Sequence, residues 1–147
     1  MAATANSWKL NSGKFKIKWF NKAANTVIST GVMAELVAGV LVEATTTAGA
    51  ADTPIVGVYA GPSIATTSSN YAVAEKLPVY VPESPSALFQ GAVDTGTLVA
   101  VSEGLSYDIS ATNGVTQSTS TNNPVLCARY ISGTLGLFAI NSLGAPR

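Results

Sequence analysis

The sequence predicts an all-β protein, a small β-sandwich or β-barrel preceded by an extended basic N-terminal arm. From residue 31 onward, short apolar runs rich in Val, Ile, Leu and Tyr alternate with clusters of Gly, Pro, Asn and Ser. Many short strands separated by frequent turn signals are typical of sandwiches and barrels. Before residue 31, lysines alternate with large apolar residues, and the length of 147 residues suits one domain with one core.

The N-terminal arm is expected to cover residues 1–31. Its first twelve residues are small and polar except for Trp8 and Leu10, which is typical of a terminal segment that orders on contact. Residues 14–19 then alternate strictly between lysine and Phe, Ile or Trp. In a strand this pattern places the lysines on one face and the apolar residues on the other. Such a strand either forms a protected sheet edge or lies across a neighbour with its apolar face down.

Residues 32–147 are expected to form a single β domain that closes a core by itself. Val32–Val42 contains good helix formers, but its glycine and its valines favour a strand. Three stretches of small residues, 45–52, 66–70 and 110–123, are expected to be loops. The expected strands are Leu36–Val42, Ile55–Tyr59, Leu77–Val81, Ala87–Phe89, Leu98–Val101, Leu105–Ile109, Val125–Ile131 and Leu135–Ile140.

One of these strands makes an explicit burial prediction. Side chains alternate between the two faces of a strand. We therefore expect Leu105, Tyr107 and Ile109 to point into the core. Ser106 and Asp108, which lie between them, are expected to point outward.

Charge is scarce and unevenly distributed. Charged residues make up 11% of the chain and the net charge is zero, whereas typical soluble domains carry roughly 25% charged residues. Residues 1–31 hold five lysines and no acid, a net charge of +5, and residues 32–147 hold eight acids against three basic residues, a net charge of −5. These parts can attract each other or a neighbouring copy. Five lysines without an arginine make a weak footprint for nucleic acid, so we expect no nucleic-acid partner.

The sequence predicts no catalytic residue. Val93-Asp94-Thr95-Gly96-Thr97 resembles the Asp-Thr-Gly motif of aspartic proteases, which a short chain can complete by dimerising. The same residue types make an ordinary β-turn. Leu135-Gly136 matches only half of the downstream glycine signal that the protease family needs. We therefore expect no enzymatic activity.

Metal, thiol and membrane chemistry are also not predicted. The chain has no histidine, one cysteine and scattered acids, so we expect no metal site and no cofactor. Cys127 stands in an apolar run and is expected to be buried and structural. The most apolar stretch, Val32–Val42, is short and contains Glu35, so we expect no membrane span. No signal peptide is visible, and we expect synthesis in the cytoplasm.

The order of apolar segments along residues 31–141 carries a family resemblance. The segments are Val40-Leu41-Val42, Val56-Gly57-Val58-Tyr59, Leu77-Pro78-Val79-Tyr80-Val81-Pro82, Gly104-Leu105-Ser106-Tyr107-Asp108-Ile109 and Leu137-Phe138-Ala139-Ile140-Asn141, after a polar N-terminal segment. This layout resembles the small capsid decoration (cement) proteins of tailed bacteriophages. Members of that family are β-rich, usually trimeric, and bind the outer capsid near local three-fold axes, often through an N-terminal arm.

The resemblance implies a structural virion protein that is made in the host cytoplasm and binds the major capsid protein. It also implies a homo-oligomer, which in this family is usually a trimer. It brings no catalytic residue. The alternative is a phage tail, fibre or adhesin module that binds host surface sugars through Ser/Thr loops and Tyr59, Tyr71 and Tyr80.

The N-terminal arm is where we expect the partner to bind. It holds both tryptophans, two of the four phenylalanines and five of the eight basic residues. We expect removal of residues 1–30 to leave a folded domain that no longer binds, unless Phe15, Ile17 and Trp19 complete the domain's own core. The candidate partner-binding residues are Trp8, Lys14, Phe15, Lys16, Ile17, Lys18, Trp19 and Phe20.

Overall fold

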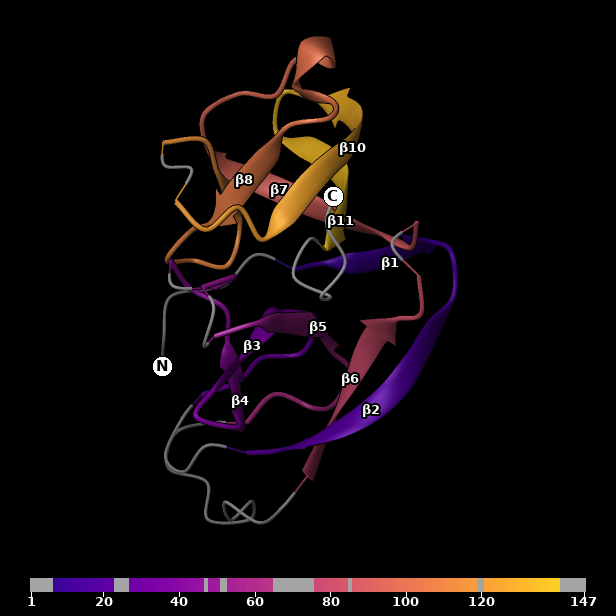
Figure 1. The fold of residues 1–147 in the computed structure, drawn as a ribbon, viewed down its shortest axis with the longest axis vertical. Helices are drawn as coiled ribbons and strands as arrows, with labels where there is room; N and C mark the ends of the chain where they lie inside the picture. Colours follow the sequence, from indigo (N-terminus) through magenta and orange to yellow (C-terminus); the bar gives the residue numbers. More distant parts are fainter. Residues whose placement is uncertain are drawn as a thin grey trace.

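The protein is all-β, as the sequence predicted (Figure 1). A computed structural model describes residues 7–22, 27–46, 48–50, 53–64, 76–84, 86–118 and 121–140. Within these residues the elements are β1 (Lys9–Ser12), β2 (Phe15–Asn21), β3 (Met33–Val37), β4 (Val40–Glu43), β5 (Ile55–Tyr59), β6 (Lys76–Pro82), β7 (Leu88–Thr95), the 3-10 helix η1 (Ala100–Ser102), β8 (Ser106–Ile109), β9 (Val115–Thr116), β10 (Val125–Ser132) and β11 (Leu135–Ile140).

Five strands close into a barrel, seen in the upper half of Figure 1. They follow one another in the order β7-β11-β10-β8-β9. A parallel pairing of Val93 in β7 with Val115 in β9 completes the circle. β1 lies beside the first part of β7, where Lys9 pairs with Gln90. Closure pairs the barrel strands with one another, which removes the free edges that an open sheet would present.

A second sheet of antiparallel strands lies below the barrel in Figure 1, in the order β2-β6-β5-β3-β4. β2 forms one edge of this sheet and pairs with β6 along its whole length, without a bulge. An isolated parallel bridge between Lys22 and Leu41 brings the end of β2 beside β4. The molecule is therefore a closed barrel packed on a second sheet, whose two edge strands meet at this bridge.

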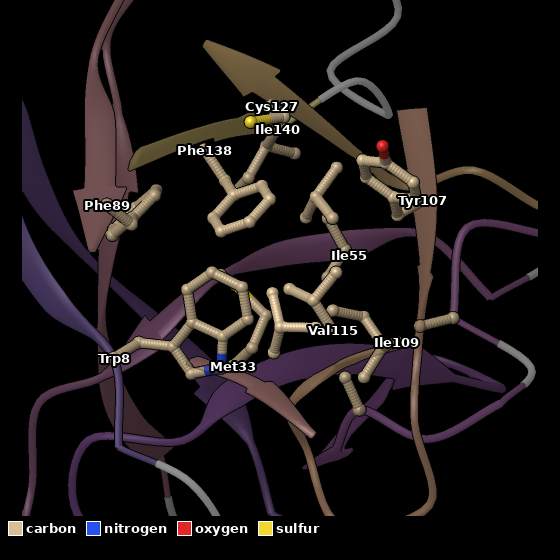
Figure 2. Close-up of a cluster of buried hydrophobic side chains, with 14 of the residues drawn as sticks. Trp8, Met33, Ile55, Phe89, Tyr107, Ile109, Val115, Cys127, Phe138 and Ile140 are labelled. Carbon is tan, nitrogen blue, oxygen red and sulfur yellow. The ribbon is translucent and has the colours of Figure 1, made fainter. Parts of the chain in front are cut away.

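The main core fills the space between the barrel and the second sheet (Figure 2). Met33 of β3 and Ile55 of β5 belong to the same buried cluster as Phe89 and Phe138 of the barrel. The buried members of this cluster are Trp8, Met33, Ala44, Ala48, Ile55, Val58, Phe89, Val93, Leu98, Tyr107, Ile109, Val115, Val125, Cys127, Phe138 and Ile140. Because both sheets contribute, neither sheet can bury its apolar face alone.

A second apolar cluster covers the opposite face of the second sheet. It includes Leu77 and Val79 of β6 and Tyr59 of β5. Ile28 and Ile64, which pair with each other outside the named strands, close it from one side. The second sheet is thus buried on both faces over its central strands, whereas β2 stands at its edge.

Trp8 lies within the main core, directly before β1. Its side chain is 3% exposed and its ring packs edge-on against Phe138, with centroids 5.8 Å apart. The indole Nε1–H donates to the backbone carbonyl of Asn113 over 2.7 Å. Gly91 makes room for the indole, because a Cβ at that position would lie 2.3 Å from the ring. Trp8 is therefore a core residue rather than an anchor on a flexible arm.

The described part of residues 1–31, the expected N-terminal arm, is paired into both sheets. It supplies one strand to each sheet: β1 pairs with β7 and β2 with β6. The backbone N–H of Trp8 also donates to the carbonyl of Gly31 over 2.7 Å. The segment from residue 7 to residue 22 is thus built into the domain that we expected to close without it.

Asn113 joins the barrel to the second sheet. Its side-chain oxygen accepts the N–H of Met33 over 2.7 Å, and its amide nitrogen donates to the carbonyls of Met33 and Ala44, each over 2.8 Å. Asn113 is 1% exposed and has a positive φ of 67°, a conformation that asparagine tolerates better than most residues. Asn113-Gly114 reads as a turn in the sequence, but here the turn residue is a buried crosslink.

Several strand expectations are confirmed and others are corrected. Ile55–Tyr59 and Leu135–Ile140 are strands with the expected bounds. Leu98–Val101 is not a strand: the chain tightens into η1, where Ser102 N–H donates to the carbonyl of Val99 over 2.9 Å. β9 lies within residues 110–123, which we expected to be a loop throughout. It has only two residues, too few to leave an alternating pattern.

The predicted burial pattern of residues 105–109 is also corrected in part. Tyr107 and Ile109 are buried as expected, but Leu105 is exposed. Asp108 is buried, because its carboxylate accepts the backbone N–H groups of Thr121, Asn122 and Asn123 over 2.7–2.9 Å. A carboxylate that gains three such hydrogen bonds offsets the cost of leaving water.

The turn between β3 and β4 gives a test of local strain. Val32–Val42 forms strand structure, as expected, but it reverses direction at Ala38 and Gly39, whose φ angles are 51° and 83°. Two consecutive positive φ values are typical of a type I′ hairpin turn, which favours Asn-Gly. We expect Ala38→Asn to raise the free energy of unfolding by about 0.5–1 kcal/mol in urea denaturation, because alanine is strained in this conformation.

Gly39 provides the matched control. No atom lies within 4 Å of a Cβ built there, so Gly39→Ala changes only the backbone preference. It should lower the free energy of unfolding by about 1 kcal/mol. If Ala38→Asn is neutral while Gly39→Ala destabilises, the strain at Ala38 is smaller than its φ indicates.

Candidate interaction surface

β2 carries the alternating lysine and apolar residues that the sequence singled out. Its ladder with β6 runs in one continuous register, and directly paired residues point to the same face of a sheet. Lys16 and Lys18 pair with Val81 and Val79, so the lysines share the face that carries the second apolar cluster. At the sheet edge their side chains are exposed.

The other face of β2 carries an exposed apolar strip. Ile17 pairs with Tyr80 and Trp19 with Pro78. Ile17 is 49% exposed and Trp19 58% exposed, and the two β6 residues are half-buried. Over β3 and β5 this face of the sheet is covered by the barrel, but β2 extends beside it (Figure 1). We call Ile17, Trp19, Pro78 and Tyr80 the β2 apolar strip.

Within the described residues, no strand pairs with the backbone edge of β2 that faces away from β6, although the end of β2 lies near β4. β6 occupies one side of β2, and the only other contact of strand type is the Lys22–Leu41 bridge beyond its end. Lys14, Lys16 and Lys18 are exposed along this edge, and residues 7–22 contain no acid. The edge is therefore basic, with apolar side chains on one face.

Three of the predicted partner-binding residues belong wholly or partly to the protein's own core. Trp8 is buried, as described above. Phe15 is half-buried and packs on Phe89, with ring centroids 4.9 Å apart. Phe20 is half-buried against the second apolar cluster. The residues of the prediction that remain available to a partner are Lys14, Lys16, Ile17, Lys18 and Trp19.

A second exposed apolar surface, which sequence reasoning missed, lies at the end of the barrel. The backbone N–H of Tyr130 donates to the Glu103 carboxylate over 2.8 Å, and that of Leu98 to the carbonyl of Gly133 over 2.9 Å. These bonds hold the η1 segment against the β10–β11 hairpin. The exposed residues of this barrel tip are Val99, Val101, Leu105, Tyr130 and Ile131. The only sequence signal was the run 98–101, which reads as an ordinary strand.

Asp94 of the protease-like motif supports a loop. It is exposed at the end of β7, and its carboxylate accepts hydrogen bonds from the hydroxyls of Thr112, over 2.6 Å, and Ser110. These bonds tie the turn between β8 and β9 to the end of β7. The absence of hydrolase activity stays a prediction, and this geometry gives Asp94 a structural role.

The remaining chemistry-bearing groups are few. Across the described ranges, no cluster of three or more His, Cys, Asp or Glu side chains is placed to hold a metal ion. Cys127 is buried; burial raises the pKa of its thiol, Glu103 raises it further, and a hydrogen bond from the backbone of Arg129 opposes the shift. The described part of the chain also contains no helix long and apolar enough to cross a membrane.

Two of the three tyrosines proposed for sugar binding lie in the described part of the chain. Tyr59 is buried, and its hydroxyl donates to the carbonyl of Pro62 over 2.7 Å. Tyr80 is half-buried in the β2 apolar strip. Tyr71 lies outside the described residues. Tyr59 therefore gives the sugar-binding alternative no exposed ring, and Tyr80 gives it a partly exposed one.

Neither a protein-family model nor a curated protein sequence matches the chain.

Proposed function

We propose that the protein is a structural virion protein that binds the outer surface of an assembled phage capsid and stabilises it. Its partner is the major capsid protein, and its contact surface is the β2 edge with Ile17 and Trp19. The observation that carries the proposal is the coincidence, on one strand, of exposed apolar side chains with a basic edge to which no strand of the described residues is paired.

Three features support this function. An open strand edge can add a strand from another protein, in which main-chain hydrogen bonds supply affinity. Exposed tryptophan is among the residues that dominate binding energy at interfaces. The low share of charged residues, 11%, means that few ions must lose water when surfaces meet.

We infer the capsid as the partner, and the trimeric state, from the resemblance of residues 31–141 to capsid decoration proteins. We propose a homotrimer on the capsid surface, in which each copy contributes a modest interface. Many copies on one shell add such interfaces into a large total stabilisation.

Sedimentation with capsids that lack the protein tests the proposal. Wild-type protein should pellet with capsids, and Trp19→Ala should weaken binding by about 2 kcal/mol, roughly 30-fold, because it removes an interface anchor. Lys16→Ala should weaken binding less, and it alone should reduce the dependence of binding on salt concentration.

Val101→Ala is the matched control, because Val101 is 80% exposed on the barrel tip, away from β2. It should leave capsid binding unchanged. Loss of binding in Val101→Ala with retention in Trp19→Ala would move the contact to the barrel tip. If wild-type protein does not sediment with capsids at all, the proposed function is wrong.

A further inference from the structure

We propose that the β2 edge accepts an extended segment of a partner protein in which acidic and apolar residues alternate. This inference rests on the proposed function, in that it names the chemistry of the partner at the same surface. The inference follows from the two faces of β2. The lysine face and the apolar face are each complementary to a different kind of side chain on an added strand.

The geometry of an added strand fixes which side chains meet. A strand that pairs with the open edge of β2 lies about 4.8 Å away, and residues opposite each other point to the same face. Residues opposite Lys16 and Lys18 therefore lie on the lysine face, and residues opposite Ile17 and Trp19 lie on the face of the β2 apolar strip. Opposite charges stabilise such cross-strand pairs, as apolar contacts do. The complement of β2 is therefore a strand of alternating acidic and apolar residues.

β2 is better suited to this role than the other sheet edges. It is seven residues long, has no bulge and contains no proline. β1 has four residues and a register shift, and β4 also has only four residues. Lysines at a sheet edge normally oppose the addition of strands. That explanation does not account for Ile17 and Trp19, which are large, apolar and about half exposed on the opposite face.

A second copy of β2 is a poor occupant of this edge. Residues 7–22 contain no acid, so in every register the lysines of one copy would meet lysines or uncharged side chains of the other. Like charges directly opposite each other are destabilising. The lysines thus disfavour self-pairing and favour an acidic partner, which is specificity through repulsion as well as attraction.

Blocked eight-residue peptides test the inference on the full-length protein. A peptide of alternating Glu and Val should bind with a dissociation constant of about 1 mM or tighter at low salt. It should shift the backbone amide resonances of β2 and the fluorescence of Trp19. A peptide of the same composition in the order Glu-Glu-Val-Val, and one of alternating Lys and Val, should each bind at least about tenfold more weakly.

Two controls separate strand addition from simple charge attraction. The double variant Lys16→Glu, Lys18→Glu should no longer bind the Glu/Val peptide and should bind the Lys/Val peptide instead. N-methylation of alternate peptide nitrogens should abolish binding for one set of positions and spare the other, because only one set faces β2. Equal binding of the two Glu peptides, or no binding by either, overturns the inference.

The peptide and capsid experiments fail independently. If no peptide binds, but capsids still capture the protein and Trp19→Ala prevents it, the proposed function stands and the strand-addition inference is wrong. If the alternating peptide binds but capsids do not, β2 accepts such a strand from a partner other than a capsid. A single-stranded oligonucleotide can be added as a competitor of the bound Glu/Val peptide. If it displaces this peptide as well as unlabelled Glu/Val peptide does, the lysines bind polyanions in general, which also overturns the inference.

Discussion

Asn113→Asp is expected to lower the free energy of unfolding by about 3–5 kcal/mol at neutral pH, a loss typical of breaking a buried polar network. The asparagine amide donates to the carbonyls of Met33 and Ala44. A carboxylate has no hydrogen to donate, so the carbonyl of Ala44 would lose its side-chain donor, while that of Met33 would keep only the N–H of Ala44. A charge would also be buried between the two sheets. An orphaned buried acceptor alone costs about 1–3 kcal/mol. Denaturation in guanidinium chloride measures the loss.

The pH dependence of this variant has a defined sign. Burial raises the pKa of a carboxyl group above its unfolded value. The folded state then binds more protons than the unfolded state between the two pKa values, so stability rises as pH falls. The difference between Asn113→Asp and wild type should therefore shrink on acidification. A deficit that stays below about 1 kcal/mol at pH 7, under the usual cost of such a loss, would mean that water or a rearranged turn replaces the amide.

Asn113→Gly separates the backbone from the side chain. Glycine adopts the φ of 67° without strain, so this variant loses the side-chain hydrogen bonds but buries no charge. It should be less destabilised than Asn113→Asp and should show no added pH dependence. If the two variants are equally unstable at every pH, the charge is solvated and the two sheets have separated at this point.

The class of fold could be predicted because strand formation leaves a local trace. Ile55–Tyr59 and Leu135–Ile140 are apolar runs of strand length between turn residues, and the structure confirms both bounds. The strand of alternating lysines was equally visible, since an edge strand displays both faces. Such features depend on residues a few positions apart, which a sequence shows directly.

The sequence-based expectations that the structure corrects mainly concern residues whose contacts join distant parts of the chain. Asn113 binds Met33, 80 positions away, and Trp8 donates to Asn113 across 105 positions. Neither has a local pattern: an Asn-Gly pair reads as a turn, and a tryptophan among small polar residues reads as an exposed anchor. Asp108 is similar, because the N–H groups that allow its burial come from residues 121–123.

The candidate surface could be predicted only in part for the same reason. The alternation along residues 14–19 gave the faces of β2 correctly. It could not tell which aromatic side chains the rest of the fold covers: Phe15 meets Phe89, whereas Trp19 stays exposed. Phe15 lies where the barrel still covers the second sheet, whereas Trp19 lies beyond the covered area.

Trp8→Ala is expected to lower the free energy of unfolding by about 3–5 kcal/mol, whereas Trp19→Ala should change it by less than about 0.5 kcal/mol. Both substitutions remove the same side chain from the same N-terminal segment. Trp8 is enclosed by the main core and leaves a cavity beside Phe138, but Trp19 is 58% exposed. Urea denaturation of both variants, followed by far-UV circular dichroism, makes the comparison.

Removal of residues 1–30 extends the same test. It deletes Trp8, strips β1 from β7 and β2 from β6, and exposes both apolar clusters. Because a domain of this size is stable by only about 5–15 kcal/mol, we expect the shortened chain to lose its cooperative melting transition and to aggregate. A truncated protein that melts cooperatively, with Trp8→Ala as stable as Trp19→Ala, would show that the N-terminal segment is a detachable arm after all. The tryptophan pair therefore decides whether the segment that we propose as the partner-binding surface also holds the fold together.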